Sequence, residues 1–221
     1  MNDIDLIAQR RGFLGLSAAG MAAGVGAMLP VAAAAAAQRP STPFTKWLDT
    51  LNGSYRQVFD MPEVNDGMGL VWAWVFLYTG PQAYGVPEGD LTAVIVLRHN
   101  AIPLALQDSA WAKYKLGEVF KIQDPETKAP AVRNPFYYKP GAMPTPDGIQ
   151  NLVNRGVKVV ACDLAIHFYS GVVAEKMKLK HEDVKADWMN AVHPGIVHAP
   201  SGVVAVNGSV SQGCVYSYAG G

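Results

Sequence analysis

The chain has 221 residues, half of them hydrophobic, and its 18 basic side chains balance its 18 acidic ones. A neutral chain of this size can bury a substantial core. Its balanced charge, with no run of Lys and Arg after the first residues, does not predict electrostatic binding to nucleic acids or anionic lipids. Its two cysteines, Cys162 and Cys214, are too few to hold a fold together by disulfides. We therefore expect small molecules or proteins as partners, and no nucleic acid.

The first 37 residues are typical of a twin-arginine signal peptide. Residues 9–14 read QRRGFL, in which Arg10 and Arg11 precede an Ala- and Gly-rich apolar run that ends at Ala37. The three alanines that end the run suit a signal peptidase, so we expect cleavage there and a periplasmic protein that is not attached to the membrane. The alternative is an uncleaved anchor, because the apolar run could cross a bilayer of about 30 Å. Alanine and glycine contribute little transfer free energy, which favours cleavage.

Strand-like and helix-like patterns alternate in the rest of the chain. Short runs rich in β-branched and aromatic residues are expected to be strands, and they span 55–60, 92–97, 157–162, 195–198 and 214–218. Apolar residues at helical spacing lie between these runs, in segments 65–79, 102–114, 147–155, 167–179, 181–189 and 203–210. Five strands separated by helices require right-handed crossovers. We therefore expect an α/β fold that is flavodoxin-like and doubly wound, with a mostly parallel sheet and helices on both faces.

Certain residues mark the expected ends of the helices. The first helix should stop at residues 80–81, a Gly-Pro pair, and Asp147 should cap the helix over 147–155. Gly156 is well placed to end that same helix, and Ser201 to cap the last one.

Three parts of the chain follow from these patterns. Residues 1–37 form the signal peptide, residues 38–54 a linker or N-terminal extension, and residues 55–221 one α/β domain. Residues 117–146 are rich in proline and lack periodicity, which predicts an irregular excursion outside the core of that domain.

Two segments of the domain resemble the DsrE/DsrF-like family of sulfur-relay proteins. They are residues 156–162, which read GVKVVAC, and residues 200–206, which read PSGVVAV and precede the closing strand. The resemblance spans roughly residues 55–221, and it is closest to an exported branch of the family. It implies a homo-oligomer, a trimer or a hexamer, and a persulfide carried on Cys162. It also implies a small sulfur species, or a sulfur or redox protein, as the partner.

Cys162 is a candidate nucleophile on physical grounds as well. It ends the third expected strand, and ligands of parallel sheets bind at this edge, where helix N-termini present free N–H groups. Such surroundings stabilise the thiolate that attacks sulfane sulfur. Asp163 acts in the opposite direction, because a neighbouring carboxylate disfavours the thiolate. A buried structural cysteine is the alternative.

Three histidines are expected near Cys162. His99 follows the second strand and His198 ends the fourth, so both should emerge at the same edge, while His167 should begin the next helix. They could serve as a base for the thiol or as ligands for zinc or copper. The chain has neither Cys-x-x-Cys nor His-Glu-x-x-His spacing, which favours separate histidines and no metal site. No glycine-rich phosphate loop follows a strand, so we expect no cofactor.

Cys214, His181 and His193 are expected to lie away from this site. Cys214 begins the last strand, at the opposite edge of the sheet, so its Cα atom should be farther from that of Cys162 than the roughly 7 Å that a disulfide tolerates. His181 and His193 are expected at the surface.

Two classes of function are compatible with these residues. One is a periplasmic sulfur carrier or sulfurtransferase with a persulfide on Cys162. The other is a non-catalytic oligomeric module that binds a small ligand, a metal or a redox partner. Under either class of function, the apolar helix over 65–79 would form the contact between subunits of the oligomer.

Overall fold

A computed structural model describes residues 41–139 and 147–221. The chain divides into two units, residues 1–39 and 40–221, and the fold below is that of the second. The expected signal peptide lies outside the described residues. Within the described part of the chain, no helix is long and apolar enough to cross a membrane.

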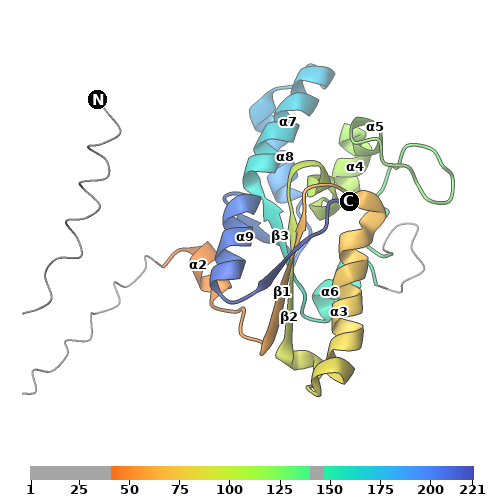
Figure 1. The fold of residues 1–221 in the computed structure, drawn as a ribbon. Helices are drawn as coiled ribbons and strands as arrows, with labels where there is room; N and C mark the ends of the chain where they lie inside the picture. Colours follow the sequence, from red (N-terminus) through yellow and green to blue (C-terminus); the bar gives the residue numbers. More distant parts are fainter. Residues whose placement is uncertain (1–40, 140–146) are drawn as a thin grey trace, which may run out of the picture. The chain divides into compact units, whose positions relative to one another are not determined.

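The described residues form a parallel sheet with helices around it (Figure 1). The strands are β1 (Tyr55–Met61), β2 (Leu91–Leu97), β3 (Lys158–Cys162), β4 (Val197–Ala199) and β5 (Val215–Tyr218). The helices are α2 (Pro43–Leu48), α3 (Met68–Tyr84), α4 (Asp108–Tyr114), α5 (Leu116–Val119), α6 (Ile149–Asn154), α7 (Asp163–Met177), α8 (His181–Asn190) and α9 (Gly202–Ser211). Short 3-10 helices span Asn65–Gly67, Glu88–Asp90 and His99–Ala105.

The strands lie in the order β4-β3-β2-β1-β5, and every pair of neighbours is parallel. The chain steps from β1 to β4 in one direction and then returns to place β5 beside β1. The predicted five-stranded parallel sheet of flavodoxin-like α/β type is therefore confirmed.

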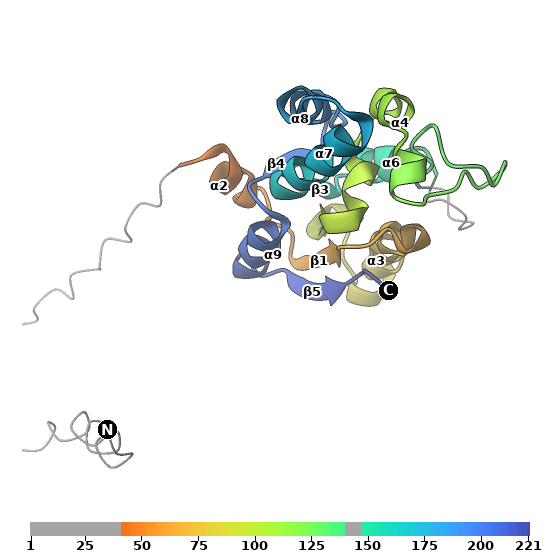
Figure 2. The same cartoon turned by 90° about the horizontal axis from the view of Figure 1, so that it is seen from above.

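Helices cover both faces of the sheet (Figure 2). On one face, α2 and α9 pack against Val58, Val96 and Val160, and the other helices cover Phe59 and Ile95 on the opposite face. Alternate residues of each strand point to opposite faces, so a strand covered on both sides must be apolar throughout. All seven residues of β2 are buried, as this arrangement requires.

Part of the expected N-terminal extension belongs to the core. The hydroxyl of Thr42 accepts a hydrogen bond of 3.1 Å from the backbone N–H of Thr45 and so caps α2. Trp47, Leu48 and Leu51 are buried against the sheet. Residues 43–51 are therefore more than a linker.

Two expected helix ends are wrong. Helix α3 continues through Pro81 to Tyr84 and ends at Gly85, which has a φ of 66°. A proline this close to the end of a helix removes one hydrogen bond of the last turns without ending the helix. Asp147 does not cap α6, because its carboxylate pairs with Arg155 instead. By contrast, Gly156 follows Arg155, the C-cap of α6, with a left-handed φ of 95° that suits its expected role at the end of this helix.

The segments that flank the excursion also differ from the expected pattern. The amphipathic stretch 102–114 is split between the 3-10 helix that contains Pro103 and helix α4. The excursion opens with α5, and its residues 120–139 are mainly turns, joined by a single bridge between Gln123 and Pro130. Its residues 140–146 lie outside the described part.

Candidate functional site

The carboxyl ends of the strands meet at one edge of the sheet. Leu97 at the end of β2 pairs with Met61 on one side and Ala161 on the other, and Cys162 pairs with Ala199. Side chains that directly follow these strands therefore gather at the same edge, where parallel sheets bind their ligands.

A cavity of about 480 Å³ opens at this edge, and we call it the Cys162 cavity. The polar side chains that line it are Arg98, His99, Cys162, His167, Tyr169 and Ser201. Its apolar walls include Leu164, Phe168 and Val203, which are 60%, 60% and 68% exposed. A thiol, a guanidinium and two imidazoles therefore lie in one cavity with an exposed apolar rim.

Cys162 caps helix α7 with its own side chain. Its Sγ accepts a hydrogen bond of 3.3 Å from the backbone N–H of Ala165, and the residue is only 5% exposed. The thiol thus faces the N-terminus of α7, where the first backbone N–H groups and the helix dipole present partial positive charge. Because Cys162 supplies the cap, α7 begins at Asp163. The expectation that His167 starts this helix is wrong, since it lies in the second turn.

The carboxylate beside Cys162 is paired. Oδ1 of Asp163 lies 2.6 Å from Nδ1 of His198, the middle residue of β4. This hydrogen bond raises the pKa of His198 above its usual value, although partial burial acts against it. A protonated His198 therefore offsets the negative charge that Asp163 brings near the thiol. His198 is not among the residues that line the Cys162 cavity.

The main cation of the cavity, Arg98, was not predicted from the sequence. Its Nε and Nη2 donate hydrogen bonds of 2.6 and 2.9 Å to the two carboxylate oxygens of Asp60, the residue before the last of β1. Tyr216 donates another, of 3.0 Å, to Asp60. The bond with Asp60 raises the pKa of Arg98 further, so the guanidinium stays charged. The signal for Arg98 was its position directly after a buried strand.

Gly202, the first residue of α9, makes room for Arg98. A Cβ atom at Gly202 would lie 2.5 Å from the Cβ of Arg98 and 2.7 Å from its Cδ. Any side chain there would displace the arginine, so this glycine allows Arg98 to lie across the N-terminus of α9.

Of the expected histidines, His99 and His167 line the Cys162 cavity. His181 is half-buried beside His167, with the ring centroids 4.8 Å apart and its Nε2 bonded to the carbonyl of His167. Over residues 41–139 and 147–221, no group of three or more His, Cys, Asp or Glu side chains is placed to hold a metal ion.

Two further expectations concern residues away from the cavity. Cys214 lies just before β5, and burial raises the pKa of its thiol. Cys162 and Cys214 form no disulfide, as expected. The expectation of a surface position for His193 is wrong: it is 7% exposed, and its ring stacks on Tyr137 with the centroids 3.5 Å apart. Burial lowers the pKa of His193 to about 4.

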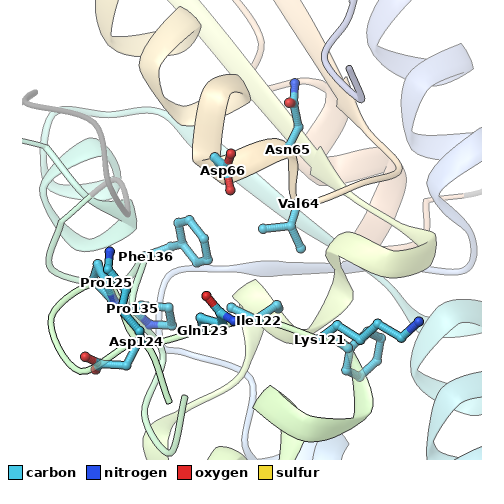
Figure 3. Close-up of a pocket in the computed structure, with 12 residues that line it drawn as sticks. Val64, Asn65, Asp66, Lys121, Ile122, Gln123, Asp124, Pro125, Pro135 and Phe136 are labelled. Carbon is cyan, nitrogen blue, oxygen red and sulfur yellow. The ribbon is translucent and has the colours of Figure 1, made fainter. Parts of the chain in front are cut away.

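A second hollow, of about 350 Å³, lies between the 3-10 helix after β1 and the excursion (Figure 3). It is lined by Val64, Asp66, Asp124 and Phe136 among others, and none of its lining residues is a cysteine or a histidine. The carboxylate of Asp124 accepts backbone hydrogen bonds within its own turn. We therefore place the candidate site at the Cys162 cavity, which holds a thiol and lies at the carboxyl edge of the sheet.

Comparison with known proteins gives little that bears on function. No protein-family model matches the chain, and no curated protein matches it either. Among solved structures, a protein of unknown function from Methanobacterium thermoautotrophicum is similar, at 13% sequence identity and a TM-score of 0.38. The match covers 74% of this chain and 98% of the other. A TM-score this low supports no statement about fold or activity.

Proposed function

We propose that the protein is a periplasmic sulfur carrier or sulfurtransferase that holds a persulfide on Cys162. The observation that carries the proposal is the position of Cys162 Sγ, which caps α7 at the wall of a cavity that also holds Arg98. A helix N-terminus stabilises the thiolate, and the thiolate is the form that attacks sulfur.

The transfer itself needs no oxidant. The Cys162 thiolate would attack the outer sulfur of a polysulfide or of thiosulfate. The sulfur–sulfur bond of the donor breaks and a new one forms to Cys162. The rest of the donor leaves with the bonding electron pair, as a shorter polysulfide anion from polysulfide or as sulfite from thiosulfate. The reaction is an exchange at sulfur of the same kind as thiol–disulfide exchange.

The hydrogen-bond donors of Arg98 and α9 favour an anionic substrate. Arg98 uses Nε and Nη2 to hold Asp60, and no hydrogen bond from its Nη1 to another described residue is present. The backbone N–H groups of Gly202 and Val203, in the first turn of α9, have no acceptor within the helix and lie at the same cavity. These donors would bind a sulfonate group of the donor or the outer sulfur of the persulfide. The exposed apolar rim of the Cys162 cavity suits contact with a protein, which would accept the sulfur atom.

Replacing Cys162 by serine should abolish sulfur loading without unfolding the protein. Intact mass is measured after treatment with polysulfide or thiosulfate, and again after a reductant. Wild-type protein should gain the mass of about one sulfur atom and lose it on reduction. Cys214→Ser is the matched control and should still load, because burial raises the pKa of Cys214 and keeps that thiol unreactive. If wild-type protein gains no sulfur, the module that binds a small ligand becomes the better account.

Export by the twin-arginine pathway is part of the same proposal. The mature protein should begin at or near Gln38 and be recovered from the periplasm, because the paired arginines precede a run that ends in small residues. N-terminal sequencing of the native protein measures the cleavage site. Unchanged export of a variant with Arg10→Lys and Arg11→Lys, or a full-length product in washed membranes, would contradict this assignment.

A further inference from the structure

His99 has a strained backbone at the wall of the Cys162 cavity. Its φ is 50°, in the left-handed region that residues other than glycine rarely adopt. It begins the 3-10 helix His99–Ala105 directly after Arg98, and its side chain is 57% exposed. Strain of this kind persists only where the surrounding structure maintains it, and it clusters at functional sites.

A carboxylate lies beside the His99 ring. Nδ1 of His99 lies 3.4 Å from Oε1 of Glu63. Glu63 is itself fixed, because both of its oxygens accept from the Asn100 amide at 3.0 and 2.9 Å. The Asn100 oxygen in turn accepts from the Tyr169 hydroxyl at 2.5 Å, and the Tyr169 ring lies edge-on to His99. A residue of α7 therefore helps to hold Glu63 in place.

The two nitrogens of the imidazole have different neighbours. Nδ1 faces Glu63, and Nε2 is left without a hydrogen-bond partner among the described residues. The other titratable side chains that line the cavity with His99 are Arg98, Cys162, His167 and Tyr169. Burial raises the pKa of Tyr169, and the charge of Glu63 raises it further, so this hydroxyl keeps its proton. Of the two imidazoles that line the cavity, His99 is the one with a carboxylate beside one nitrogen and no hydrogen-bond partner on the other.

We propose that His99 is the general acid and base of sulfur transfer at Cys162, and that Glu63 is its positioning residue. This inference rests on the proposed function. During loading from an alkyl persulfide, the Cys162 thiolate bonds to the outer sulfur, which keeps its proton, and the donor's sulfur–sulfur bond breaks. The His99 imidazolium gives its Nε2 proton to the departing alkyl thiolate, which leaves as a thiol.

Unloading reverses these roles. The neutral imidazole of His99 accepts the proton of an incoming thiol. The sulfur of that thiol bonds to the outer sulfur of the persulfide, and Cys162 leaves as a thiolate that keeps its hydrogen bond from Ala165. One proton and one sulfur atom move in each direction, and no oxidant or reductant is consumed.

Donors with different leaving groups test the role of His99. An alkyl persulfide releases a basic thiolate, whereas thiosulfate releases sulfite, a much weaker base that gains little from protonation. His99→Asn should slow single-turnover loading from the alkyl persulfide by about 100-fold and change loading from thiosulfate little. Asparagine tolerates a left-handed backbone, so the variant should fold, and its melting temperature checks this.

Further variants test whether Glu63 positions His99 or only supports the fold. Glu63→Gln should slow loading from the alkyl persulfide, Glu63→Asp should recover part of the rate, and added imidazole should partly restore His99→Gly. His181→Gln and Glu118→Gln remove an imidazole and a carboxylate that do not line the cavity, and both should load at the wild-type rate. Wild-type rates for His99→Asn with both donors would overturn the role of His99 and leave the proposed function standing. No loading of wild-type protein by either donor would overturn both.

Discussion

Arg98→Met should lower the free energy of unfolding by about 3 kcal/mol, because it leaves a buried carboxylate without its cation. Asp60 is 4% exposed, and Arg98 provides two of the hydrogen bonds to its carboxylate, one to each oxygen. The Tyr216 hydroxyl would be its main remaining donor. The same change should slow loading from thiosulfate by about 100-fold, if the guanidinium stabilises a charged, desolvated donor by about 3 kcal/mol.

Arg155→Met is the matched control for this prediction. Arg155 is as exposed as Arg98, and it bridges Glu88 and Asp147 away from the cavity. Its loss should also reduce stability, measured by urea unfolding, but it should not slow sulfur loading. A variant with both Arg98→Met and Asp60→Asn should recover stability without recovering loading. Equal loading rates for Arg98→Met and Arg155→Met would show that Arg98 serves only the fold.

Acid should destabilise the protein through His193. Its pKa in the folded state is lowered to about 4 by burial, below its ordinary value of 6.5. Between these values the unfolded state binds a proton that the folded state does not, so stability is lost as the pH falls from about 6.5 toward 4. The loss from this one group should reach about 2–3 kcal/mol near pH 4.

His193→Phe should remove most of this loss. Phenylalanine keeps a ring against Tyr137, and it removes Nε2, which is buried without a hydrogen-bond partner. The measurement is the free energy of unfolding in urea at pH 7 and at pH 4.5. His181→Gln, at a half-buried histidine, serves as the comparison and should keep the acid sensitivity. An unchanged difference between the two pH values in His193→Phe would mean that other groups cause the acid sensitivity.

The sequence predicted those parts of the fold that depend on local pattern. The apolar run at 92–97 indicated a strand buried on both faces, and Ser201 indicated the start of α9, where its hydroxyl accepts from Val204. The same reasoning placed Cys162 at the carboxyl edge of the sheet, because a residue that ends a parallel strand must lie there.

Contacts between distant segments could not be predicted in this way. The pairing of Arg98 with Asp60 requires β1 and β2 to be neighbours, which strand patterns alone do not establish. His193 is polar and follows the polar helix α8, so its sequence surroundings indicate the surface. It is buried because Tyr137, from the irregular excursion, stacks on its ring.

Peptide mapping tests most directly whether the folded protein carries sulfur on Cys162. Native wild-type protein is loaded with polysulfide, its thiols and persulfides are trapped with an alkylating agent before unfolding, and the peptides are identified by mass. We predict one additional sulfur atom on the peptide that contains Cys162 and none on the peptide that contains Cys214. Sulfur on Cys214, or a Cys162 that reacts only after the protein has been unfolded, would contradict the account.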